Sequence, residues 1–160
     1  MTETIDTLTS RFPRPGRIAW IGLRPERRSS VIAVEAAAIL ETGLEGDHRN
    51  KAGKRAITLI QAEHLAAIAS LCGVEQLDPA PLRRNIVVTG INLLALRNRR
   101  FRCGGAVLRG TGICAPCSRM EEALGPGGYN AMRGHGGINA EVMESGLIKL
   151  KDLVEPVAEH

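Results

Sequence analysis

Short hydrophobic runs separated by turn residues dominate the chain, and this pattern predicts a protein built mainly of strands. Gly, Pro, Asn, Asp and charged residues interrupt the runs at intervals of roughly ten residues, as in many β proteins. The expected strands cover residues 17–22, 31–34, 56–60, 85–89, 101–103, 106–109, 138–142 and 147–154. Gly104-Gly105 predicts a hairpin between two of them, and Ser145-Gly146 predicts a turn before the last.

Helical periodicity is confined to a few segments. Residues 61–71 form the clearest one, because Leu65, Ile68 and Leu71 are spaced by three and Gly73 supplies a stop. A second, short helix is expected at 118–124, whereas the alanines at 36–38 suit a helix or a strand. The fold class predicted is therefore mainly β with one or two helices, in a β-barrel or mixed sheet rather than a doubly wound sheet.

The length of 160 residues fits one domain, and 44% hydrophobic with 24% charged residues is typical of a globular chain. We expect a flexible N-terminal tail at 1–15, because Pro13, Pro15 and Gly16 disfavour a helix there. A single domain is expected over 16–155, with a C-terminal tail at 156–160. Since no signal peptide and no apolar run of about 20 residues is found, we expect a cytoplasmic protein without a membrane partner.

A formal net charge of +4 suits an anionic ligand or a nucleic acid. The aromatic content of 2% disfavours a nucleic-acid partner, because single-strand and RNA binders stack bases on aromatic rings. A small phosphorylated ligand fits the composition better. The four cysteines are too few for a disulfide scaffold and are expected to be reduced.

The pair Cys114 and Cys117, in a Cys-x-x-Cys motif, is the first candidate for chemistry. As half of a zinc site it lacks a second pair, because Cys72 and Cys103 are isolated. A redox pair should stand at a helix start in a βαβ unit, which the pattern does not predict. The third reading is one reactive or metal-ligating thiolate beside the cation of Arg119. Burial as small apolar side chains suits Cys72 and Cys103 better than this pair.

Arginines supply the second candidate. Arg83, Arg84 and Asn85 precede an expected strand, and guanidinium groups bind phosphate through a rigid fork. From these residues alone, a solvated turn is the favoured interpretation. The arginine-rich run at 97–102 is either a solvated face or a rim that faces an anion.

Two glycine-rich loops carry further candidates. Asp47 and His48 could act as a base or as metal ligands, although such a pair more often closes a turn. Arg133 and His135 flank glycines that could form an anion-binding nest or a mobile loop. His64, on the expected helix, is expected to be a surface or satisfied residue. No motif of P-loop proteins, dinucleotide-binding enzymes, zincins or α/β-hydrolases occurs.

The order of the motifs is more specific than any one of them. They are Gly-Leu-x-Gly-Asp-His at 43–48, Arg-x-Ile-Thr-Leu-Ile-Gln-x-Glu at 55–63, Leu-Arg-Arg-Asn-Ile-Val-Val-x-Gly at 82–90, Phe-Arg-x-Gly at 101–104, Cys-x-Pro-Cys at 114–117, Gly-His-Gly-Gly at 134–137 and Ser-Gly-x-Ile at 145–148. This series resembles the MOSC domain, which is found at the C-terminus of molybdenum cofactor sulfurases. With the opening strand, the resemblance covers residues 16–155. It implies a β-barrel-like fold and an association with the molybdenum cofactor, a pterin dithiolene that carries a phosphate.

The resemblance also implies roles for individual residues. In the family a cysteine ligates molybdenum or carries sulfur as a persulfide, and Cys117 matches it because it follows Pro116. Cys114 would then be a neighbouring, resolving thiol. Arg83 and Asn85 match an Arg-x-Asn pair that holds the cofactor in related reductases. The other residues expected to bind the cofactor are Arg84, which stands where many members have Pro, Asp47, His48, Arg119, Arg133 and His135.

Three functions follow from the resemblance and the residues together. The first is reduction of N-hydroxylated compounds, with molybdenum on Cys117 and a separate redox partner as electron donor. The second is a sulfur carrier with a persulfide on Cys117, loaded by a separate cysteine desulfurase. Pyridoxal phosphate would belong to that partner, because this chain is too short to hold a desulfurase domain as well. The third is a non-catalytic module whose basic rim binds an acidic partner.

Overall fold

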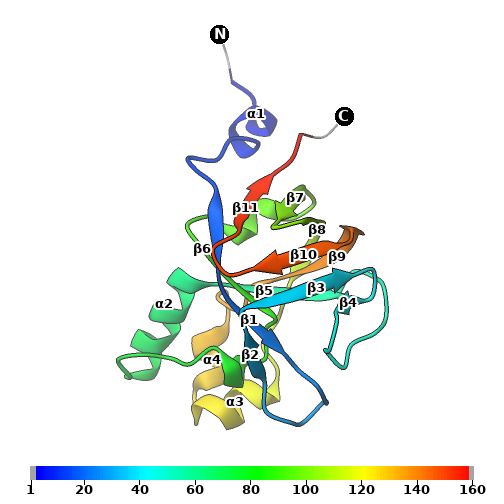
Figure 1. Ribbon diagram of the computed structural model, residues 1–160. Helices are drawn as coiled ribbons and strands as arrows, with labels where there is room; N and C mark the ends of the chain where they lie inside the picture. Colours follow the sequence, from blue (N-terminus) through cyan, green and yellow to red (C-terminus); the bar gives the residue numbers. More distant parts are fainter. Residues whose placement is uncertain (1–2, 159–160) are drawn as a thin grey trace.

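The computed structural model describes residues 3–158 as a β-barrel with helices gathered at one end (Figure 1). The strands are β1 (Gly16–Leu23), β2 (Ile32–Val34), β3 (Ala36–Leu40), β4 (Gly43–Leu44), β5 (Ile57–Gln61), β6 (Ile86–Thr89), β7 (Arg100–Cys103), β8 (Ala106–Ile113), β9 (Ile138–Glu144), β10 (Gly146–Lys149) and β11 (Leu153–Pro156). The α-helices are α1 (Ile5–Thr9), α2 (Ala62–Cys72), α3 (Ser118–Leu124) and α4 (Gly128–Met132), and two 3₁₀ helices are η1 (Ala80–Leu82) and η2 (Leu93–Leu96). The expected mainly β fold class is confirmed.

The barrel closes through the strand order β11-β7-β8-β9-β5-β6-β1, with β11 also paired to β1. Strand β2 adds to the outside of β1, and β10, β3 and β4 form a separate sheet of three strands. All barrel pairs are antiparallel except β5 and β6, which are parallel and joined through α2. Closure leaves the barrel strands without open edges, which limits pairing with other chains.

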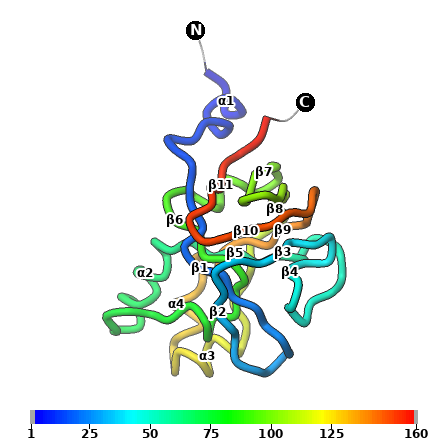
Figure 2. Tube along the Cα trace, viewed as in Figure 1, coloured from blue at the N-terminus to red at the C-terminus, as the bar shows by residue number. Residues whose placement is uncertain are grey.

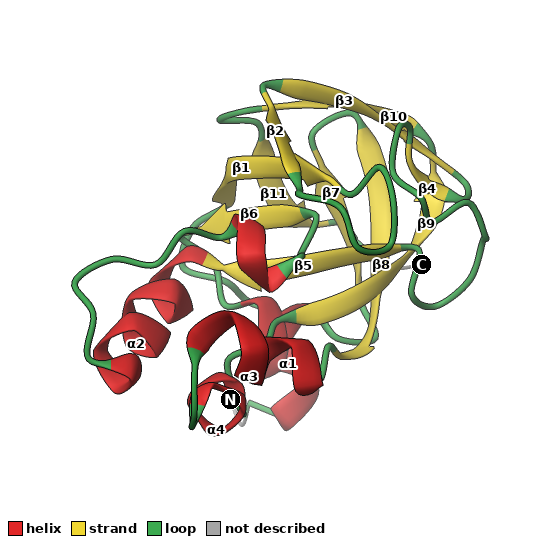
Figure 3. Cartoon of the chain, turned by 90° about the horizontal axis from the view of Figure 1, so that it is seen from below, coloured by secondary structure: helices red, strands yellow, loops and turns green. Residues whose placement is uncertain are grey.

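The protein has one hydrophobic cluster inside the barrel and a second on the barrel's outer side, because successive side chains along a strand point to opposite faces. Ile57 and Leu59 of β5 join the cluster inside the barrel, whereas Ile60 joins a second cluster on its outer side. Val87 of β6 and Met120 of α3 belong to the same outer cluster. Burial of one such aliphatic side chain stabilises the fold by roughly 1.5–3 kcal/mol. Helices α2, α3 and α4 therefore lie over the outside of β5 and β6 (Figure 3).

Helix α2 follows the prediction over its length but not over its whole buried face. Gly73 ends it with a left-handed φ of 74°, as expected. Ile68 is fully buried, but Leu71 is 63% exposed, so its expected place in the buried face was wrong. On a helix of 3.6 residues per turn, a residue six positions after Leu65 lies on a different side of the helix. Leu71 therefore points to solvent.

Two short helices were not predicted, one of them in the expected N-terminal tail, so residues 3–158 contain four α-helices rather than one or two. Helix α1 has no buried residue and is capped by the Thr4 side chain, which accepts a hydrogen bond from the backbone N–H of Thr7 at 3.1 Å. Helix α4 begins at Gly128, between the predicted helix at 118–124 and the glycine-rich loop of Arg133 and His135. The alanines at 36–38 belong to strand β3. Residues 1–2 and 159–160 of the expected tails lie outside the described residues.

The first and last described elements, α1 and β11, lie at the same end of the molecule (Figure 2). Helices α3 and α4 lie at the opposite end. Within residues 3–158, none of the helices combines the length and the apolar composition needed to cross a membrane.

Candidate functional site

The two cysteines of the Cys-x-x-Cys motif lie on a short connection between a strand and a helix. Strand β8 runs to Ile113, four residues beyond its predicted end, and Cys114 follows directly. The Cys114 N–H donates to the carbonyl of Gly137 at 2.9 Å, while Cys117 is the N-cap residue of α3. Cys114 is half-buried and Cys117 is exposed. The connection therefore presents one thiol to solvent and withdraws the other.

A buried arginine holds this connection in place. Arg84 is 6% exposed and donates to the carbonyl oxygens of Gly136 at 2.8 Å and Leu82 at 3.0 Å. It also donates to the carbonyls of Cys114 and Ala115, both at 3.4 Å. The guanidinium of Arg84 thus ties the cysteine connection to the loop before β9 through backbone oxygens. Its neighbour Gly136 leaves no room for a side chain, since an added Cβ would overlap the Cys114 carbonyl oxygen.

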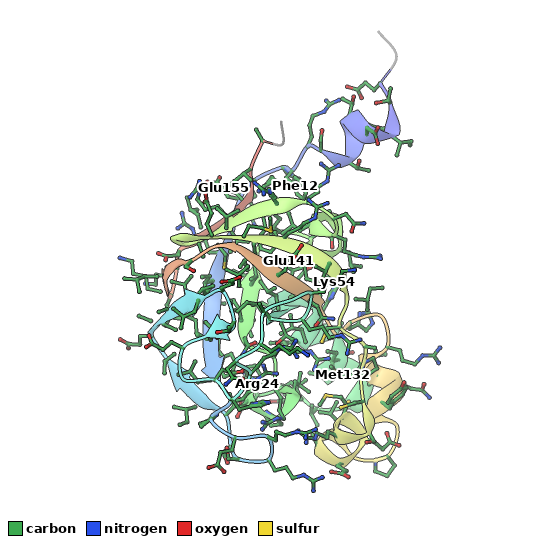
Figure 4. The ribbon with its side chains drawn as sticks, turned by 90° about the vertical axis from the view of Figure 1, so that its right-hand side faces the viewer. Phe12, Arg24, Lys54, Met132, Glu141 and Glu155 are labelled. Carbon is green, nitrogen blue, oxygen red and sulfur yellow. The ribbon has the colours of Figure 1, made fainter. Side chains whose placement is uncertain are left out.

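An ion pair between Arg24 and Asp47 lies beside this connection. Arg24 Nε and Nη2 donate to the two carboxylate oxygens of Asp47 at 3.0 and 2.9 Å, and its backbone N–H donates at 2.7 Å. The Asp47 side chain is 1% exposed and that of Arg24 is 12% exposed. Figure 4 places Arg24 toward the end of the molecule that also contains Met132, away from Phe12 and Glu155.

Asn85 completes the network from the start of β6. Its Nδ2 donates to Asp47 at 3.2 Å and to the Gly22 carbonyl at 3.3 Å. Its Oδ1 accepts from the Thr58 backbone N–H and hydroxyl, both at 3.2 Å, and from Arg24 at 3.3 Å. Asn85 is 1% exposed, so all its polar atoms are used inside the protein. It therefore fixes the ion pair against β5.

The pKa of Asp47 lies below its ordinary value. Burial alone would raise it, but the hydrogen bonds and charge of Arg24, with the backbone N–H of Arg49, outweigh burial and lower the pKa. Asp47 is therefore an ionised partner of Arg24 at neutral pH. This arrangement does not leave it free to act as a general base.

A cavity of about 270 Å³ opens beside this network. Its lining consists of Arg24, His48, Arg49, Arg55, Thr58, Ile113, Cys114, Ala115 and Asn139. His48 is an exposed lining residue whose Nδ1 lies 2.9 Å from the Arg24 carbonyl. Burial raises the pKa of Cys114, although Arg84, Arg24 and Arg55 act in the opposite direction. This smaller cavity is thus basic and contains a thiol that stays protonated at neutral pH.

A second cavity of about 460 Å³ lies at the other end of the connection. Its lining consists of Arg28, Pro81, Arg83, Ser118, Arg119, Glu122 and Ala123. Arg83 has a left-handed φ of 59° and donates to the carbonyls of Ser29 and Glu26. Burial, followed by the charges of Arg119 and Arg24, lowers the pKa of Arg83. This larger cavity therefore holds cations that repel one another and that an anion would stabilise.

The remaining predicted residues lie apart from both cavity linings. Arg133 is exposed and donates to Asn130 Oδ1 at 3.4 Å. The His135 ring meets that of His64 edge to face, with centroids 5.2 Å apart, and its buried Nδ1 has no hydrogen-bond partner within residues 3–158. His64 is half-buried, and burial together with His135 lowers its pKa. His135 nevertheless directly precedes Gly136, whose carbonyl accepts from Arg84, so its loop contacts the cysteine connection while its ring meets His64.

Sequence reasoning missed three arginines of the smaller cavity. Arg24 and Arg49 fall in an expected turn and an expected loop, and Arg55 opens the motif at 55–63, but sequence reasoning assigned none of the three a role in a site. The sequence held a signal only for the role that Arg24 fills, because a carboxylate such as that of Asp47, if buried, needs a cation as its partner. Which of the many arginines supplies it depends on the tertiary fold.

A zinc site of four cysteines does not form. Cys103 lies in the barrel core, where burial raises its pKa to about 12, and Cys72 ends α2. In the part of the chain that the structure describes, no group of three or more His, Cys, Asp or Glu side chains could hold a metal ion.

Solved structures of three proteins resemble this chain. The YuaD protein from Bacillus subtilis aligns with a TM-score of 0.80 at 18% identity, over 94% of this chain and 100% of its own. YiiM from Geobacillus stearothermophilus gives 0.74 at 17%, over 90% and 76%. YiiM from Escherichia coli gives 0.69 at 19%, over 90% and 71%. At these identities the likeness concerns the fold.

The sequence itself assigns the family. No curated protein matches the chain. The family model of the MOSC domain matches residues 45–155, which extend from the loop of Asp47 to strand β11. Members of this family generally bind the molybdenum cofactor. The barrel, the motif order and this match agree, and the chain belongs to the MOSC domain family.

Proposed function

We propose that this protein binds the molybdenum cofactor, with Cys117 as the molybdenum ligand, and reduces N-hydroxylated compounds with electrons from a separate redox partner. One observation carries the proposal: the connection that bears both thiols lies between two arginine-lined cavities. Family membership supplies the cofactor class.

The residues around Cys117 fit an anionic, sulfur-rich cofactor. Arg28, Arg83 and Arg119 offer guanidinium groups to its phosphate, and the larger cavity that they line begins one residue after Cys117. A thiolate is a soft ligand of the kind that a pterin-bound molybdenum accepts. Exposure favours Cys117 over Cys114, because burial raises the pKa of Cys114 and disfavours its thiolate.

The cofactor, when bound, supplies the electron and oxygen-atom chemistry. The protein's own residues hold the cysteine connection and the neighbouring ion pair in position. Arg84 fixes the backbone on which both thiols stand, and Asn85 holds the Arg24–Asp47 ion pair against the barrel. Ligands held on such rigid supports keep their geometry through turnover. The roles that we propose for Arg84, Asn85 and Asp47 are therefore positioning roles rather than direct contacts with the cofactor phosphate.

A sulfur carrier is the second candidate, and the exposure of Cys117 favours it. A thiol at the surface can receive sulfur from a separate desulfurase and pass it to another protein. In this case Cys117 would carry a persulfide, and Cys114 would be the neighbouring thiol that resolves it.

The test is molybdenum by elemental analysis, with pterin fluorescence after oxidation, on protein from cells that make the cofactor. We expect near-stoichiometric metal and pterin in the wild type and in Cys114→Ala, and loss of both in Cys117→Ala. Equal loss in the two variants would refute the choice of Cys117. Neither metal nor pterin in the wild type, with cyanide-labile sulfur on Cys117, would replace the reductase with the sulfur carrier.

A further inference from the structure

We propose that the outer face of the β10-β3-β4 sheet is an interface at which two copies of this chain associate about a two-fold axis. Among the described residues, the face contributes nothing to the lining of either cavity around the cysteine connection. The inference therefore stands apart from the proposed function and from the cofactor.

The first observation is that strand β3 is apolar on both of its faces. Ala37 and Ile39 pack inward on the cluster inside the barrel, and Ile148 of β10 is buried beside Ala37. The outward positions of β3 hold three further apolar residues, Ala36, Ala38 and Leu40. An antiparallel sheet with one solvated face normally alternates apolar and polar residues. This sheet departs from that pattern, because its outer face is apolar as well.

The second observation is a pair of exposed leucines on this outer face. Leu147 of β10 is 73% exposed and lies across from Ala38 in the register of the two strands, so both side chains share the face. Leu40, at the next outward position of β3, is 41% exposed. Figure 3 shows β3 and β10 at the outline of the molecule, with helices α2, α3 and α4 on the other side of the barrel. A contiguous apolar surface of this kind marks an interaction site.

The third observation is that opposite margins of the face carry opposite charges. Lys149 follows the buried Ile148 on β10, and Glu45 follows the buried Leu44 of β4. Both charged residues are exposed, and alternation places both on the outer face. The Glu45 backbone N–H donates to the Ala38 carbonyl at 2.9 Å, so Glu45 lies beside β3 on the side away from β10. Since neighbouring strands are about 4.8 Å apart, β3 keeps the two charges from pairing within one chain.

This arrangement selects a second copy of the chain as the partner. A two-fold contact repeats each pairing, so a face with a cation at one margin and an anion at the opposite margin is complementary to itself. A two-fold axis that lies in the interface and passes between Lys149 and Glu45 brings each of them against the other residue of the second copy. The same axis brings Leu147 toward Leu40 of the second copy. Neither Lys149 nor Glu45 forms an ion pair within residues 3–158, and the dimer supplies one to each.

Sedimentation velocity over a range of protein concentrations tests the inference with Leu147→Glu. The control is Leu71→Glu, because Leu71 of α2 is 63% exposed and lies outside the face. A face of three short strands is small, so we expect a wild-type dimer with a Kd on the order of 10 µM. Leu147→Glu should raise this Kd about tenfold or more, and Leu71→Glu should leave it unchanged. A wild type that is monomeric up to about 500 µM, or a dimer that persists equally in Leu147→Glu, overturns the inference.

Charge reversal tests how the two copies are arranged. Lys149→Glu and Glu45→Lys should each weaken the dimer, because each variant alone places like charges together in both repeats of the contact. An equimolar mixture of the two variants should regain the wild-type Kd, since every such contact then joins opposite charges. A mixture that associates no better than either variant alone overturns the proposed pairing, whatever the molybdenum content of the protein.

Discussion

Replacing Asp47 by Asn tests whether the Arg24–Asp47 pair organises this end of the barrel. The change removes the charge that balances Arg24 in a site where the two side chains are 1% and 12% exposed. Breaking a buried ion pair at one partner costs about 3–5 kcal/mol, because the remaining charge has left water without compensation. Asn keeps one acceptor oxygen for Arg24 and Asn85, so we expect the lower end, about 3 kcal/mol. For a domain of this size that loss lowers the melting temperature by roughly 6–12 °C.

The assay is urea and thermal unfolding followed by circular dichroism, with Glu3→Gln as the control. Glu3 pairs with Arg11 at the surface, where both side chains are about half exposed, and such pairs contribute at most about 1 kcal/mol. The folded pKa of Asp47 lies below 3.8, its ordinary value. The stability it contributes is therefore complete above about pH 3.8 and lost as the pH falls through the folded pKa. A cost for Asp47→Asn no larger than that of Glu3→Gln near pH 7 would refute the reasoning.

Three further outcomes follow from the same geometry. Arg84→Lys should cost about 2–4 kcal/mol in urea unfolding, because an ammonium cannot replace a fork that serves several carbonyls, and a neutral change would contradict that role. Gly136→Ala should speed thiol labelling of Cys114 several-fold by displacing its carbonyl, and unchanged labelling would show that the loop adapts. In native protein at pH 8, mass spectrometry after iodoacetamide should find Cys117 modified first and Cys103, with its pKa of about 12, unmodified until unfolding. Early modification of Cys103 would contradict its place in the core.

Local patterns were enough to predict much of the fold. The β-branched runs at 57–60 and 86–88 form strands because both faces of β5 and β6 are buried, and Gly73 ends α2 through its left-handed backbone. The five-residue helix α1 depends on a side-chain cap and carries no periodic signal. Barrel closure, the β11–β1 pairing, joins residues far apart in the sequence, so the strand pattern left a barrel and a mixed sheet both open, and the resemblance to a family favoured the barrel.

The candidate site could be predicted only in part. The Cys114–Cys117 motif and the two arginines before β6 are visible locally, but their different environments are not. Arg84 turns inward to backbone oxygens while Arg83, with its left-handed φ, lines a cavity. The partner of Asp47 could not be named because Arg24 comes from the end of β1, and only the barrel brings the two together.

The most direct test of the central claim is X-ray absorption at the molybdenum edge of cofactor-loaded protein, comparing the wild type with Cys117→Ser and Cys114→Ser. The cofactor brings a dithiolene, and Cys117 would add a further sulfur ligand to the metal. We predict that the spectrum of Cys117→Ser loses one sulfur neighbour and that the spectrum of Cys114→Ser matches the wild type. An unchanged sulfur shell in Cys117→Ser would show that Cys117 does not ligate molybdenum.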